Sequence, residues 1–294
     1  MDARKESLCL IGKFFNTSRD PAGRGIRTIR LSDIQAICAK TKLLQVEVEI
    51  SCLQYGIIPL RYLRNIGTVG IEGQLKLLRS TVAICGAGGL GGTIIELLAR
   101  QGVGHLVIID NGRFMENNLN RQIIATESDL RRSKVKVAAE RVKKINSTVR
   151  VTTVNKFIEA ANIMDFIGGA NVVMDGLDSL TTRLLVAEAC HKLKIPFVHG
   201  AIAGFNGQVM TVCPGDKGLS AIYGPNMDKA AHGLETLTGN PPATPAIIAA
   251  WEVQEAVKII TGVGKPIRNR LLFLDFAEGS FEEIPLQEVP DGLS

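Results

Sequence analysis

From residue 81 onward, short apolar runs alternate with longer stretches in which apolar positions recur at helical spacing. Apolar runs with the length of buried strands occupy 81–85, 105–109, 149–154, 171–174 and 196–199. Amphipathic patterns that predict helices occupy 90–101, 134–145 and 179–193. Apolar strands that alternate with amphipathic helices are typical of a parallel sheet with helices on both faces. The pattern therefore predicts an α/β fold with a doubly wound, Rossmann-like, mostly parallel sheet.

The pattern changes beyond residue 200. The run 205–213 favours an antiparallel strand, and 271–286 favours a hairpin. A helical pattern over 245–261 places Pro245 near its first position. Residues 214–243 carry Gly, Pro and Asn without a clear period, and loops of that length inside compact domains are usually functional or disordered. The sheet is therefore expected to end in antiparallel C-terminal strands.

Residues 1–58 are expected to form a small helical N-terminal region. The sequence SDIQ at 32–35 has the form of a capping box, which predicts a helix over 32–39. Residues 44–54 fit a strand or a helix by period, and the glycine that follows them favours helix. The stretch 18–27 has the composition of a loop. Two short helices could form a helix-turn-helix, but they carry few basic residues, so packing or dimer support is favoured over DNA binding.

Composition narrows the class of protein. The chain has 294 residues, of which 46% are hydrophobic, and a formal net charge of +5. These values suit one large α/β domain with a small appendage, and the charge is modest for a nucleic-acid binder. No apolar run reaches the roughly 18 residues that span a membrane, and the apolar patch near the N-terminus is too short for a secretory signal. A cytoplasmic location is therefore expected.

A glycine-rich segment, TVAICGAGGLGG at 81–92, joins the first of these strands to its helix. Glycines let the backbone turn sharply and approach a phosphate, and a helix N-terminus offers unpaired N–H groups and a positive dipole end. The next strand ends at Asp110, whose carboxylate can hold ribose hydroxyls. These features fit any nucleotide, NAD included, and a tight turn without a ligand has the same pattern.

Charged residues that follow the loop indicate polyphosphate chemistry. NNLNRQ at 117–122 follows Asp110, Lys134 opens a basic helix, and Asp178 lies in MDGLDSLTTR after a later strand. Cations neutralise phosphate charge, and a lone carboxylate can hold a hydrated Mg²⁺ beside the phosphates. A hydride-transfer site does not require cations and a second carboxylate near the glycine loop. Taken singly, Lys134 could belong to a solvated helix face and Asp178 could cap a helix.

Together these segments resemble the ThiF/MoeB/HesA family, the sulfur-carrier adenylyltransferases related to ubiquitin-activating enzymes. The resemblance rests on RYLRN at 61–65, GAGGLGG, IID, NNLNRQ, Lys134 and DGLDSLTTR in the family's order and spacing. It implies an ATP-binding adenylyltransferase domain over 59–294. The implied reaction adenylates the C-terminal glycine carboxylate of a small ubiquitin-like sulfur carrier that ends in Gly-Gly, for thiamine, molybdenum or tungsten cofactor, or cysteine biosynthesis. The implied cofactors are ATP and Mg²⁺.

The resemblance also implies a role for each matching residue. The implied nucleotide-binding residues are Gly86, Gly88, Gly89, Gly91, Asp110, Asn118, Arg121 and Lys134. Asp178 is the implied Mg²⁺ ligand. Arg64, the second arginine of RYLRN, matches an arginine that reaches the triphosphate from the neighbouring subunit, which implies a homodimer. The implied catalytic residues are therefore Arg64, Arg121, Lys134 and Asp178.

The chain departs from the family's pattern in its cysteines and in one acidic position. It has six cysteines and no CxxC pair, so neither a structural zinc nor a disulfide scaffold is expected. No cysteine lies within 214–243, where many members carry one, and Cys213 is the nearest thiol. The reaction is therefore expected to stop at the adenylate. Gly112 replaces the second acid of the family's DxD, and His199, without a second ligand at metal spacing, is interpreted as a satisfied structural residue.

Three other functions stay open on the sequence. A tRNA-bound carboxylate could be the group that is adenylated, although RYLRN and the modest net charge fit a carrier protein better. An NAD-dependent oxidoreductase would use the same glycine loop, but it leaves the cations and Asp178 without a role. A catalytically inactive scaffold is disfavoured because Arg121, Lys134 and Asp178 are all present.

Overall fold

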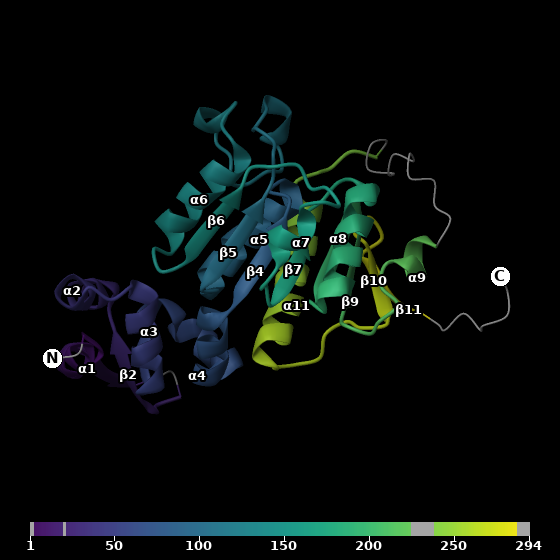
Figure 1. Ribbon diagram of the computed structural model, residues 1–294. Coiled ribbons are helices and arrows are strands. Elements are labelled where there is room, and N and C mark those ends of the chain that lie inside the picture. Colours follow the sequence, from purple (N-terminus) through teal and green to yellow (C-terminus); the bar gives the residue numbers. More distant parts are fainter. Residues whose placement is uncertain (1–2, 20–21, 225–237, 287–294) are drawn as a thin grey trace.

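The computed structural model describes residues 3–19, 22–224 and 238–286, and its centre is an eight-stranded sheet (Figure 1). The strand order is β11-β10-β9-β8-β7-β4-β5-β6. The parallel strands are β4 (Thr81–Cys85), β5 (His105–Ile109), β6 (Arg150–Val154), β7 (Val172–Asp175) and β8 (Phe197–Ala203). The antiparallel strands are β9 (Asn206–Val212), β10 (Arg270–Asp275) and β11 (Ser280–Pro285). Both the parallel centre and the antiparallel C-terminal strands are confirmed.

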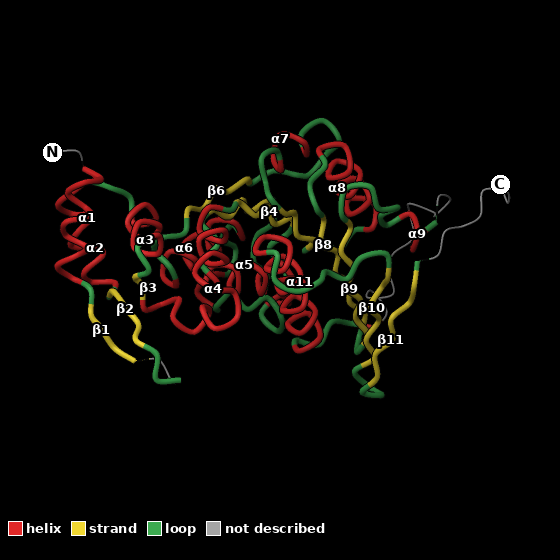
Figure 2. The backbone as a smooth tube through the Cα atoms, turned by 90° about the horizontal axis from the view of Figure 1, so that it is seen from below, coloured by secondary structure: helices red, strands yellow, loops and turns green. Residues whose placement is uncertain are grey.

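Helices cover both faces of this sheet, as Figure 2 shows from below. One face carries α4 (Leu63–Arg79), α5 (Gly89–Gln101), α6 (Lys134–Ile145) and α11 (Ala243–Thr261). The other face carries α7 (Ile163–Ile167) and α8 (Leu180–Leu193). Because side chains alternate along a strand, Val82 and Ile84 of β4 join the first core, whereas Ala83 and Cys85 join the second. The doubly wound arrangement is therefore confirmed.

The N-terminal region contains more than the expected helices. Its helices are α1 (Ala3–Phe14), α2 (Leu31–Thr41) and α3 (Gln45–Gln54), and a small sheet is formed by β1 (Asn16–Arg19), β2 (Gly25–Ile29) and β3 (Ile57–Pro59). Together they enclose a core of their own, which includes Ile11, Ile29, Ile37 and Val48. Figure 1 shows the region at one end of the molecule. The helix over 44–54 is confirmed, but 18–27 forms parts of two strands rather than only a loop.

Two predicted helix starts differ from the structure, by one residue in α2 and by two residues in α11. The capping residue of α2 is Arg30, which makes no side-chain cap hydrogen bond, so Ser32 lies inside the helix. Helix α11 starts at Ala243 with Pro242 before it, which makes Pro245 the third helical residue. Differences of this size are usual at helix ends, which fray by one or two residues.

Part of the chain between β9 and α11 lies outside the described residues. The predicted loop over 214–243 includes a short helix, α9 (Ser220–Tyr223), and the positions 225–237 that are not described. None of the described helices is long and apolar enough to cross a membrane.

Candidate nucleotide site

The candidate site lies at the carboxyl ends of the central strands. Strand β4 pairs with β5 on one side and with β7 on the other, so the chain leaves β4 at the point where the strand order reverses. Ligands of open α/β sheets bind outside the carboxyl ends of the strands at such a point. The loop after β4 is the predicted glycine loop, and α5 begins in it at Gly89.

Three glycines bring the loops after β4 and β7 into backbone contact. Gly86 has φ of +99°, and a β-carbon there would overlap the carbonyl of Gly176. A β-carbon on Gly91 would overlap the carbonyl of Gly86. The amide of Gly86 donates to Ile109 O at 2.8 Å, and that of Gly176 donates to Cys85 O at 2.8 Å. The loops after β4, β5 and β7 therefore form one rigid edge, and Gly176 belongs to it although the glycine motif does not include it.

Asp110 and Lys134 lie together beside this edge. Asp110 Oδ2 accepts from the amide of Ala87 at 2.8 Å, and its Oδ1 accepts from the amide of Gly112 at 2.6 Å. A β-carbon on Gly112 would lie 3.3 Å from Lys134 Cε. Gly112 thus leaves room for the Lys134 side chain, which accounts physically for the missing second acid. The structure brings the Asp110 carboxylate to the glycine loop, with the Lys134 side chain beside Gly112.

The segment after β5 brings Arg121 and Gln122 to the start of α5. A β-carbon on Gly89 would lie 3.5 Å from Arg121 Cγ, and the nearest atom to one on Gly88 would be Gln122 Nε2 at 3.8 Å. Arg121 Nη1 donates to Asn117 O at 3.0 Å and to Asn120 Oδ1 at 2.9 Å, so the guanidinium keeps other N–H groups for an anion. Gln122 is buried, and its Oε1 has no partner among the described residues.

Asn118 serves the loop itself in this structure. Its Oδ1 accepts from the amide of Met115 at 3.0 Å, and its Nδ2 donates to Asn117 at 3.2 Å. These bonds shape the single turn that carries Arg121. A direct contact of Asn118 with the nucleotide stays a prediction.

Asp178 extends into solvent from the loop after β7. Ser179, not Asp178, caps α8, because Ser179 Oγ accepts from the amide of Thr182 at 3.4 Å. The Asp178 carboxylate is exposed and makes no hydrogen bond or ion pair within the described part of the chain. Gly176, two residues earlier, touches the glycine loop, so Asp178 lies within about two residue lengths of that loop. Its carboxylate is thus available to a cation, and helix capping does not explain it.

Arg64 is the one predicted site residue that the chain does not bring to its own glycine loop. Its neighbour Asn65 donates to Gln101 O at 3.3 Å, at the far end of α5. A helix of 13 residues is about 20 Å long. The exposed Arg64 therefore lies about one length of α5 away from Gly89, where it cannot complete the site of the same subunit.

A buried polar cluster behind the Asp178 loop was not predicted. Asp175 Oδ2 accepts from Arg183 Nε at 2.6 Å and from His199 Nδ1 at 2.7 Å. Burial alone would raise the pKa of Asp175, but the neighbouring Arg183 and His199 outweigh it and hold the pKa below its usual value. Burial lowers the pKa of His199, so its ring is neutral with the proton on Nδ1. The interpretation of His199 as a satisfied buried residue agrees with these bonds.

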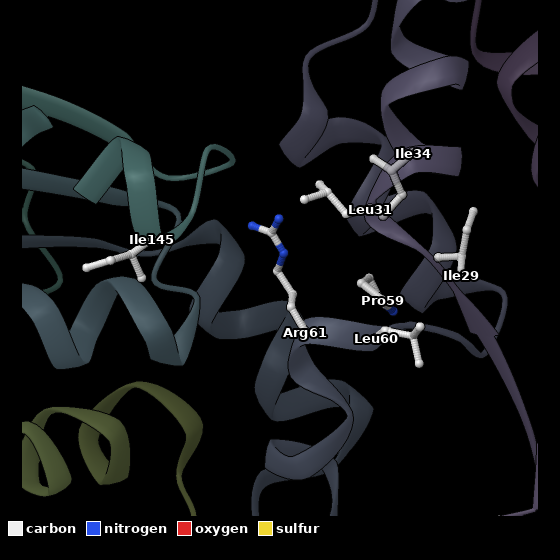
Figure 3. A pocket seen from close by; sticks show the side chains of 7 residues that line it. All are labelled: Ile29, Leu31, Ile34, Pro59, Leu60, Arg61 and Ile145. Carbon is white, nitrogen blue, oxygen red and sulfur yellow. The ribbon is translucent and has the colours of Figure 1, made fainter. Parts of the chain in front are cut away.

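One pocket of the structure lies apart from the predicted site residues. A pocket of about 330 Å³ lies between the N-terminal region and α6, with Arg61 pointing into it (Figure 3). It is lined by Ile29, Leu31, Ile34, Pro59, Leu60, Arg61 and Ile145. Within the described ranges, no three His, Cys, Asp or Glu side chains gather as metal ligands. The expectation that the chain lacks structural zinc stays a prediction.

Comparisons with known proteins identify relatives of this chain. The chain is 34% identical to the SAMP-activating enzyme E1 of Haloferax volcanii, over 79% of this chain and 86% of that protein. It is 32% identical to the sulfur carrier protein adenylyltransferase of Thermus thermophilus, over 76% and 84% of the two chains. A maize adenylyltransferase and sulfurtransferase, MOCS3-1, is 33% identical over 74% of this chain, which spans 47% of that longer protein.

Solved structures show the same fold at lower identity. Escherichia coli MccB, solved with ATP, superposes with a TM-score of 0.69 at 21% identity, over 79% of this chain and 73% of MccB. PaaA superposes with a TM-score of 0.66 at 21% identity, over 78% and 82% of the two chains. The model of the ThiF family matches residues 62–292, which include every predicted site residue. The resemblance inferred from the motifs is thereby confirmed, and the chain belongs to the ThiF family.

Proposed function

We propose that this chain is an adenylyltransferase that uses ATP to adenylate the C-terminal glycine carboxylate of a small ubiquitin-like sulfur carrier. Two relatives, named SAMP-activating enzyme E1 and sulfur carrier protein adenylyltransferase, are covered by this chain over more than four fifths of their length. The observation that carries the proposal is the meeting of the glycine loop, Asp110, Lys134 and the Asp178 loop at one edge of the sheet. The sulfurtransferase part of the longer relatives is no part of this proposal.

The proposed chemistry needs little covalent help from the enzyme. A carboxylate oxygen of the carrier attacks the α-phosphorus of ATP, the bond to the β-phosphate oxygen breaks, and pyrophosphate leaves with that electron pair. The product is a mixed anhydride of the carrier and AMP. Like charges repel as the carboxylate approaches the triphosphate, so neutralising charge and fixing geometry are the main tasks of the site.

The residues at the sheet edge suit those tasks. The N-terminus of α5 offers its first N–H groups and the positive end of its dipole to a phosphate, and the close-packed glycines keep side chains out of that space. Lys134, beside Gly112, and Arg121, beside Gly89, supply positive charge. Asp110 is held by two amides and keeps lone pairs for the ribose hydroxyls.

Asp178 is the proposed partner of Mg²⁺. Its free, exposed carboxylate beside the phosphate-binding loop fits a hard cation that keeps several waters and takes one or two carboxylates. Bound Mg²⁺ would neutralise phosphate charge. Asp178 itself would accept hydrogen bonds from the cation's waters or ligate it directly, and so fix the triphosphate relative to Lys134.

A homodimer belongs to the proposal because of Arg64. This arginine lies at the far end of α5 from its own glycine loop and makes no ion pair within the described residues. A second subunit could bring its Arg64 to the triphosphate. The exposed position of Arg64 is compatible with that role.

Intact mass spectrometry tests the proposed reaction. The enzyme is incubated with ATP, Mg²⁺ and a ubiquitin-like carrier that ends in Gly-Gly, and the expected product is a carrier heavier by one adenylyl group. A carrier that lacks the last glycine is the matched control and should stay unmodified. The proposal would be contradicted if no Gly-Gly carrier encoded beside the enzyme were modified. Transfer of AMP to a tRNA-linked carboxylate would support the alternative function instead.

A further inference from the structure

The loop that carries Asp178 is held from behind by a chain of buried hydrogen bonds. Asp175 Oδ1 accepts from the amide of Leu177 at 3.1 Å, and Arg183 Nη2 donates to Leu177 O at 2.7 Å. The backbone N–H and C=O of Leu177 are thus both fixed by buried side chains. Asp178 is the next residue, so the origin of its side chain is set by this clamp.

His199 also holds Asp175 in place. It comes from β8, the strand beside β7, and its Nδ1 lies 2.7 Å from the same Asp175 oxygen that Arg183 binds. The ring is fully buried. Because the ring is neutral, Nδ1 carries the proton that Asp175 accepts, and Nε2 is left as an acceptor.

The acceptor side of His199 meets two further side chains. Gln208 Nε2 lies 3.1 Å from His199 Nε2 and donates to Tyr223 Oη at 2.7 Å. Tyr223 Oη itself lies 3.3 Å from His199 Nε2, and the two rings meet edge to face. Tyr223 belongs to α9, in the segment that follows β9. The bonds therefore run without a gap from α9 to the Asp178 loop.

We propose that His199 is a positioning residue for the adenylation reaction, which holds the Asp178 loop through Asp175 and is itself oriented by Gln208 and Tyr223. The proposal rests on the proposed function of Asp178. Any buried histidine needs a hydrogen-bond partner on each ring nitrogen, so the role is inferred from what those partners hold rather than from the bonds themselves. The arrangement here gives both nitrogens a partner, and one of these partners directly holds the peptide before Asp178.

The role predicts a specific kinetic defect. Replacement of His199 by Leu removes the Nδ1–H bond and loosens the Asp175 carboxylate, so Asp178 loses its fixed origin. The Mg²⁺ concentration for half-maximal ATP–pyrophosphate exchange should rise about tenfold or more, the size of effect usual for residues that orient a metal ligand. The KM for the carrier should stay within about twofold, because His199 lies behind the site. His199→Asn, whose amide can donate to Asp175, should recover most of the loss.

Hydrogen exchange of the backbone gives a readout that does not depend on activity. Amides of 176–180 should exchange at least fivefold faster in His199→Leu than in the wild type, whereas those of β4 should not change. Thr211→Val is the matched control, since Thr211 lies on the neighbouring strand β9 and the change removes a different buried hydrogen bond, from the Thr211 hydroxyl to Glu255 at 2.9 Å. That control should lower stability without altering the Mg²⁺ requirement or the exchange of 176–180.

The outcomes separate this inference from the proposed function. A wild type without any ATP–pyrophosphate exchange overturns the proposed function, and the hydrogen exchange of amides 176–180 is still measurable in that case. If the wild type is active and folded His199→Leu has the same Mg²⁺ requirement and the same hydrogen exchange of amides 176–180, the role of His199 is overturned. Tyr223→Phe and His199→Asn carry the same test if His199→Leu does not fold, with Tyr223→Phe expected to speed exchange of 176–180 about twofold.

Discussion

A β-carbon on Gly176 would lie 2.9 Å from the carbonyl oxygen of Gly86, so the loops after β4 and β7 touch through their backbones. The same β-carbon would lie 2.9 Å from Gly91 Cα. Gly176→Ala should therefore push the two loops apart. We expect a loss of about 1–3 kcal/mol in the free energy of unfolding, as for other overpacked sites, and weaker ATP binding by calorimetry.

Gly12→Ala is the matched control for that substitution. Gly12 lies in α1 with no atom within 4 Å of the new β-carbon, so the change should raise stability by about 0.5–1 kcal/mol. Equal stability and ATP affinity in Gly176→Ala and the wild type would show that the loops are free to separate.

Replacement by glutamine of two buried glutamates, one turn apart on α11, should change the free energy of unfolding in opposite directions. Glu252 is fully buried, and neither carboxylate oxygen has a hydrogen-bond partner among the described residues. Glu255 accepts from Thr211 Oγ1 at 2.9 Å and from the amide of Ile267 at 2.6 Å. Glu252→Gln should raise the free energy of unfolding at pH 7.5, and Glu255→Gln should lower it by about 1–3 kcal/mol.

The sign of the Glu252 effect follows from proton uptake. Burial raises the pKa of Glu252 well above its usual value, and Asp175 adds to the rise. Above about pH 4.3 the unfolded chain loses this proton while the folded chain keeps it, so wild-type stability falls as pH rises toward the folded pKa. The advantage of Glu252→Gln should therefore grow from pH 5.5 to 7.5, by up to about 1.4 kcal/mol per pH unit. Urea unfolding at the two pH values measures it, and an advantage that shrinks with pH would contradict the buried, unpaired assignment.

The sequence predicted the central sheet well because its strands and helices have clear periods. The boundaries of β4, β5 and α6 agree with the prediction, and the glycine loop, Asp110 and Lys134 meet as the motifs implied. Such features depend on residues close together in the chain.

The missed features depend on contacts between distant segments. Strands β1 and β2 are short and show little apolar alternation, and β1 is exposed throughout. The cluster of Asp175, Arg183 and His199 joins β7, α8 and β8, and single residues on three elements leave no local pattern. The importance of Gly176 likewise appears only when Gly86 lies opposite it.

Mixing two inactive variants tests whether Arg64 acts in a second subunit. Arg64→Ala and Lys134→Ala should each lose exchange activity. A mixed dimer has one site with both lesions and one with neither, so activity should recover toward about one quarter of the wild-type level in an equal mixture. Native mass spectrometry must show that subunits exchange. Subunit exchange without any recovery of enzyme activity would argue that Arg64 does not complete the site of a partner.

Thiols should be dispensable for formation of the adenylate. Burial raises the pKa of the Cys213 thiol, and it raises the pKa of Cys190 to about 12, so neither thiol is poised as a thiolate at neutral pH. Cys213→Ser should form carrier–AMP at the wild-type rate, measured by intact mass. Loss of the adenylate in a Cys213→Ser protein of unchanged melting temperature would show that this thiol takes part.

The most direct measurement of the central claim is Mg²⁺-dependent ATP–pyrophosphate exchange in Asp178→Ala. Asp165→Ala, which removes an exposed aspartate from α7, is the matched control. With a Gly-Gly carrier, we expect the wild type and Asp165→Ala to exchange at similar rates and Asp178→Ala to lose at least 100-fold while it melts at the same temperature. Exchange in Asp178→Ala at the wild-type rate and Mg²⁺ requirement would contradict the assignment of this sheet edge as the adenylation site.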